Sequence, residues 1–64
     1  MNTSDAVEIL EAMLGHQTRR VAEAIERAKR DRVRKAQHLA AAADYALEEE
    51  ALRMALTTLQ REVQ

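Results

Sequence analysis

The chain has no cysteine, no proline, one glycine and one aromatic residue, Tyr45, among its 64 residues. The absence of cysteine excludes a disulfide scaffold, a thiolate metal site and a cysteine nucleophile. The absence of proline, together with abundant Ala, Leu, Glu and Arg, favours helix over nearly the whole chain. Because β-branched residues are few and scattered, we expect an all-α protein without strands.

Long hydrophobic runs are also missing from the sequence. No apolar segment approaches the roughly 20 residues that a membrane-spanning helix requires. Residues 1–5 are not basic and no apolar stretch follows them, which argues against a secretory signal peptide. We therefore expect a cytoplasmic protein that has no membrane partner, and the bias towards Ala and Arg suggests a bacterial source.

The residues that could carry chemistry do not form a recognisable site. His16 and His38 are the only histidines, and neither has the Glu three residues before it that helical metal sites use. The acidic run at residues 48–50 would need a water-poor cleft to act in acid–base catalysis, and two helices offer little room for one. No hydroxyl residue lies in a nucleophile motif, and no Gly-rich phosphate loop is present. We expect no enzyme activity, no cofactor and no metal ion.

Apolar residues recur in two stripes with the seven-residue spacing of a coiled-coil seam. The first stripe consists of Val7, Leu14, Val21, Ala28, Lys35, Ala42, Glu49, Leu56 and Val63. The second consists of Leu10, Gln17, Ala24, Asp31, His38, Tyr45, Leu52 and Leu59. Both stripes become polar at the centre of the chain. This pattern predicts one small domain folded as an antiparallel two-helix hairpin, with helices over about 5–29 and 37–63 and a polar tip at 30–36.

Two other arrangements are compatible with the same stripes. No Gly, Pro or Asn marks a turn near residues 29–36, and charges alternate in sign at i, i+4 from Arg19 to Lys35, which favours helix there. Two straight helices pairing antiparallel near Lys35 would form the same layers. A short first helix could instead end at Gly15, although the apolar stripe passes Gly15 without a change of phase. Ser4 or Asp5 is the expected N-cap of the first helix.

A chain of this size buries little apolar surface by itself, because 13 of its 30 apolar residues are alanines. We therefore expect it to complete a helical bundle with a second copy or with a larger protein. The residues expected to form the interface are Val7, Leu10, Leu14, Val21, Ile25, Tyr45, Leu52, Leu56, Leu59 and Val63. A second group lies outside the stripes and would also be covered by such a partner: Ile9, Met13, Leu39, Leu47, Ala51, Met54 and Ala55. Glu49, a charged residue on the seam, is a candidate for fixing register or partner choice.

The charges are unevenly distributed although the net charge is only −1. Residues 27–35 contain six basic residues and one acid, whereas the C-terminal half contains the acidic run at 48–50. The candidates for contacts with phosphate or with an acidic partner are Arg27, Arg30, Arg32, Arg34 and Lys35. The low net charge and the lack of stacking aromatics make nucleic acid the less favoured partner.

In length and in its two-helix heptad pattern, the chain resembles two kinds of small helical protein. The first are the needle-protein co-chaperones of type III secretion, hairpins that hold an aggregation-prone partner. The second are plasmid copy-number regulators, which form a four-helix bundle from two hairpins and bind RNA. From the apolar stripes and the uncovered apolar residues, we predict a small helical protein–protein interaction module. It would be an adaptor, chaperone-like or regulatory protein that acts by helix packing on itself or on a larger protein, without chemistry. The alternative is a nucleic-acid-binding helical dimer that uses the Arg-rich segment 27–35.

Overall fold

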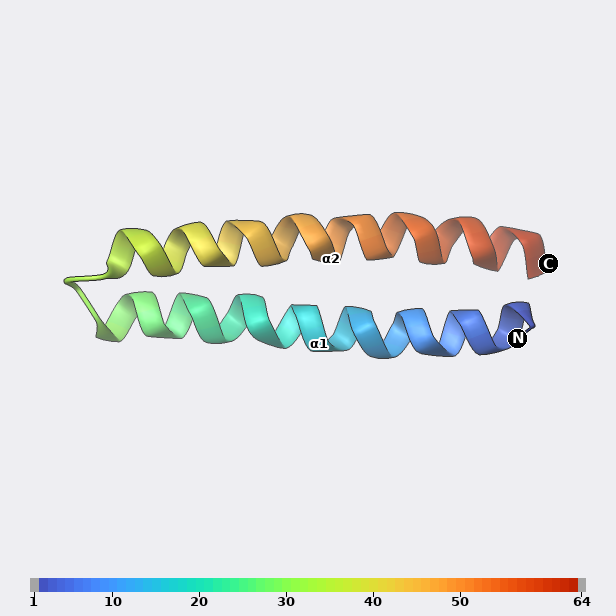
Figure 1. Cartoon of the computed structure of the whole chain (residues 1–64), viewed down its shortest axis with the longest axis horizontal. Helices are drawn as coiled ribbons and strands as arrows, with labels where there is room; N and C mark the ends of the chain where they lie inside the picture. Colours follow the sequence, from blue (N-terminus) through green and yellow to red (C-terminus); the bar gives the residue numbers. More distant parts are fainter. Residues whose placement is uncertain (1, 64) are drawn as a thin grey trace.

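A computed structural model of the chain describes residues 2–63 and the side chains of residues 2–62. It consists of two helices, α1 (Thr3–Arg30) and α2 (Lys35–Val63). The helices run antiparallel and side by side, and the N- and C-termini lie at the same end of the molecule (Figure 1). The predicted all-α hairpin is therefore confirmed, and the straight-helix arrangement is wrong. Both helices extend beyond their expected ranges, which leaves a tip of only residues 31–34.

The first helix begins earlier than expected because Asn2, rather than Ser4 or Asp5, caps it. The Asn2 side-chain Oδ1 accepts a hydrogen bond from the backbone N–H of Asp5 at 2.9 Å. Asn is among the strongest N-cap residues, since its short side chain satisfies one of the free N–H groups of the first turn. Asp5 then lies in the first turn, where the helix dipole favours negative charge.

Gly15 lies inside α1, so the short-helix alternative is also wrong. A Cβ added at Gly15 would meet no heavy atom within 4 Å. Glycine in a helix interior costs about 1 kcal/mol relative to alanine, because more backbone freedom is lost on folding. Gly15→Ala is therefore expected to stabilise the chain by about 1 kcal/mol and raise its thermal midpoint by about 4–8 °C. Thermal unfolding followed by circular dichroism tests this, and a lowered midpoint would contradict it.

The chain turns at Asp31, although the sequence has no Gly, Pro or Asn at the tip to mark a turn. The backbone N–H of Asp31 donates to the carbonyl oxygen of Arg27 at 2.8 Å and closes α1. Its carboxylate accepts the backbone N–H of Arg34 at 3.2 Å, and its other oxygen lies 3.3 Å from His38 Nε2. Asp31 thereby bonds to both sides of the turn, which is why the alternating i, i+4 charges do not continue as helix.

The two heptad stripes lie between the helices. From Val7 to Leu59, every stripe residue except Lys35 is buried or half-buried. The buried residues among those described are small, namely Ala24, Ala28 and Ala42, with Leu56 the one large side chain. This is a thin seam, since alanines allow close helix approach but remove little apolar surface from water.

The seam leaves the molecule elongated. Its extents are 48 × 15 × 14 Å and its radius of gyration is 14.7 Å, against about 11 Å for a compact domain of this length. Its solvent-accessible surface is 5003 Å², whereas a compact 7.2 kDa monomer exposes about 4,100 Å². The hairpin therefore exposes about 900 Å² more surface than a compact protein of its mass.

Candidate interaction surfaces

The expected interface residues fall mainly on the seam inside the hairpin. Val7, Leu10, Leu14, Val21, Tyr45, Leu52, Leu56 and Leu59 are buried or half-buried there. Ile25 is an exception, because its side chain is 39% exposed. The preceding residue, Ala24, occupies the seam position between the two helices. Ile25, one position further along α1, therefore points to the side of the helix pair. The side chain of Val63 lies outside the described residues.

A polar layer interrupts the seam near its middle. Gln17 Nε2 donates to the Glu48 carboxylate across the helix pair, and Thr18 Oγ1 donates to Glu49 Oε2 at 2.6 Å. Glu49 also pairs with Arg53 at 3.6 Å. The buried side-chain oxygen of Gln17, Oε1, has no hydrogen-bond partner. Polar groups at a seam position favour one register over its neighbours, so this layer fits the role expected for Glu49.

The outer face of α2 carries the two most exposed large apolar side chains of the helices, among the residues that the structure describes. Leu47 and Met54 are spaced seven residues apart and are 71% and 65% exposed. Exposed alanines line the same face within about three turns of Leu47: Ala36, Ala40, Ala43 and Ala51. Because residues three, four and seven apart share a helix face, these side chains form one continuous apolar surface, the outer face. Thus α2 is apolar on two opposite sides, and α1 covers only one of them.

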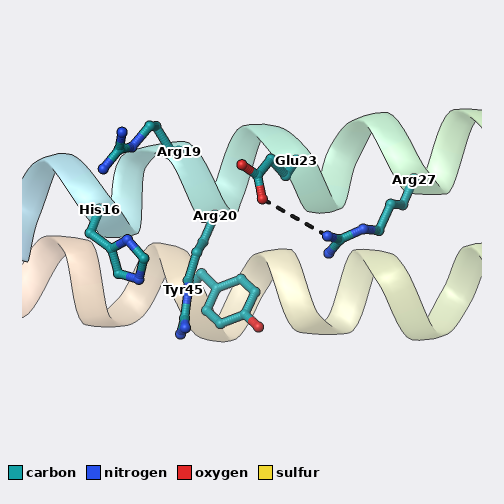
Figure 2. Close-up of a pocket in the computed structure, with 6 residues that line it drawn as sticks. All are labelled: His16, Arg19, Arg20, Glu23, Arg27 and Tyr45. Carbon is teal, nitrogen blue, oxygen red and sulfur yellow. Dashed lines mark ion pairs between the residues drawn. The ribbon is translucent and has the colours of Figure 1, made fainter.

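A shallow groove crosses the side of the hairpin (Figure 2). Tyr45 enters it from α2, and the Arg20 guanidinium lies 5.3 Å from the centre of the tyrosine ring, a cation–π contact. Glu23 and Arg27 lie beside them and pair at 3.9 Å. Three arginines line this groove, Arg19, Arg20 and Arg27, against one acid, Glu23. The groove therefore carries an excess of positive charge, although Glu23 pairs with Arg27.

The tip carries the most exposed large apolar side chain of the described residues. Val33 is 95% exposed and lies between Arg32 and Arg34. Within residues 2–63, Arg27 and Lys29 pair with glutamates of α1, whereas Arg30, Arg32, Arg34 and Lys35 make no ion pair. The expected basic cluster is thus split into a matched part on the helix and an unmatched part at the tip. The exposure of Val33 was not expected, because it depends on where the chain turns.

The comparisons with known proteins add no relative. No protein-family model, no curated protein and no solved structure matches the chain. Within the described residues, no three His, Cys, Asp or Glu side chains are placed to hold a metal ion. Neither α1 nor α2 contains an apolar stretch of the length and hydropathy that crossing a bilayer requires.

Proposed function

We propose that the protein is a small helical interaction module that binds by packing the outer face of α2 against further helices. The observation that carries this proposal is the second apolar side of α2, with Leu47 and Met54 largely exposed. Soluble monomers seldom leave a continuous apolar face on an otherwise charged surface, because covering it is favourable by about 25 cal/mol per Å². Such a module acts as an adaptor, a chaperone-like protein or a regulator in the cytoplasm, and performs no chemistry.

The geometry suits helix-on-helix recognition in particular. The alanines of the outer face let a second helix approach closely, while Leu47 and Met54 supply side chains that fill the gaps between them. Methionine adapts to irregular surfaces because its side chain is unbranched and polarizable. The hairpin in turn holds α2 straight and presents the whole face at once.

A capture experiment with a matched control tests the proposal. Tagged wild-type chain, Leu47→Lys and Ala12→Lys are each incubated with native lysate and washed at low and then high salt. Leu47→Lys is expected to lose at least ten-fold of the bound protein, self-associated chain included, because it places a charge in the apolar contact. Ala12→Lys adds the same charge on the exposed side of α1 and is expected to bind like wild type. Equal binding by both variants would contradict the proposal.

The unmatched bases at the tip support a second candidate, the binding of nucleic acid by a helical dimer. Arg30, Arg32 and Arg34 are exposed and would make phosphate contacts. The same washes separate the two candidates, since phosphate binding weakens steeply with salt and a hydrophobic helix contact does not. Nucleic acid that elutes at high salt and is lost on replacing these three arginines with Gln would favour the second candidate.

A further inference from the structure

We infer that the occupant of the outer face is a second copy of this chain, packed antiparallel about a twofold axis near Leu47. This inference rests on the proposed function, since it names the partner of the same surface. Three observations carry it: the surface area that the hairpin exposes, the pairing of side chains along α2, and the separation of charge along the molecule.

The exposed area fits one partner of this size. The solvent-accessible surface of the hairpin is 5003 Å². This is about 900 Å² more than a compact monomer of the same mass exposes. A specific interface of standard size buries about 800 Å² from each partner. A second copy laid along the 48 Å length of the hairpin would therefore cover about the amount that sets it apart from compact proteins.

An antiparallel arrangement also gives the largest side chain away from the axis, Met54, a small residue to face. With Leu47 at the axis, Ala40 of one copy faces Met54 of the other, and Ala43 faces Ala51. Leu47 then meets its own counterpart, flanked by alanines of both copies. A large side chain set against a small one lets facing helices interdigitate without leaving a void.

Charge selects the antiparallel order over the parallel one. The tip end of the hairpin is basic, since within residues 2–63 four bases there make no ion pair, Arg30, Arg32, Arg34 and Lys35, and one acid, Asp31, lies among them. The open end, residues 2–14 and 57–63, contains one base, Arg61, and four acids: Asp5, Glu8, Glu11 and Glu62. An antiparallel pair brings each basic tip beside the acidic open end of the other copy, whereas a parallel pair would bring the two tips together.

Single cysteines test the arrangement, because the natural chain contains none. Three variants, Leu47→Cys, Ala40→Cys and Met54→Cys, are oxidised separately and in pairs, and the mass of the wild-type chain is measured over a wide concentration range. We expect a mass twice the 7.2 kDa of the chain. Leu47→Cys should form a disulfide dimer with itself. Ala40→Cys should not, since its two copies would lie about 21 Å apart along the helices. It should instead crosslink to Met54→Cys.

Other outcomes overturn the inference in distinguishable ways. Self-crosslinking of Ala40→Cys as fast as that of Leu47→Cys would show a parallel pair. A dimer in which Leu47→Cys does not crosslink would show that another face is used. A monomer that loses a captured protein on Leu47→Lys would overturn the second copy and leave the proposed function standing. A monomer whose capture is indifferent to Leu47→Lys would overturn both.

Discussion

Leu56→Asp is expected to abolish the helical circular dichroism signal of the chain at room temperature. Leu56 is the one large side chain that the seam buries among the described residues, at 9% exposure. Truncating a buried leucine alone costs about 2–5 kcal/mol, and the carboxylate adds the cost of placing a charge against apolar neighbours. A domain of this length has about 3–10 kcal/mol of stability in total, and a thin seam of alanines lies at the lower end of that range.

The matched control for this substitution is Leu47→Asp on the opposite side of the same helix. Leu47 is 71% exposed and contributes little to the seam, so the hairpin is expected to keep its helical signal. If both substitutions remove the signal, the hairpin depends on its outer face as much as on its seam. If Leu56→Asp changes neither the signal nor the mass of the protein in solution, the seam is assigned to the wrong residues.

Gln17→Leu is expected to stabilise the protein by about 1–2 kcal/mol and to raise its thermal midpoint by about 5–15 °C. The buried Gln17 Oε1 has no partner, and a buried polar atom without a hydrogen bond costs about 1–3 kcal/mol. Leucine removes that cost and adds apolar surface to the layer. The bond to Glu48 is lost, but this offsets only part of the gain in stability, because Glu48 is exposed and can bond to water instead.

Gln37→Leu provides the comparison, since Gln37 is exposed near the start of α2. The same chemical change there is expected to leave the midpoint within a few degrees of wild type. Thermal unfolding measured at matched concentrations decides between the two positions. A lower midpoint for Gln17→Leu would show that the polar layer contributes more to the register of the hairpin than its orphaned oxygen costs.

The heptad pattern predicted most of the fold and most of the seam. It placed Leu14, Leu56 and their neighbours on one surface, because residues seven apart share a helix face. It placed Ala24 on the seam, where the helices meet, and it did not include Ile25, which was nevertheless among the expected interface residues and is 39% exposed. It also missed the start of the first helix, where Asn2 is the N-cap. Asn and Ser are both suitable N-cap residues, and hydrophobic periodicity does not distinguish between them.

The sequence by itself determined that the protein is helical, that one stripe of each helix is apolar, and that the apolar character breaks in the middle. These properties follow from composition and spacing, which act locally along the chain. Only the tertiary structure decided that the break is a turn. The decisive group is the Asp31 carboxylate, which reaches Arg34 and His38 once the chain has folded back. That turn also decided which surfaces remain open, because covering one side of α2 with α1 leaves the side of Leu47 and Met54 for another helix.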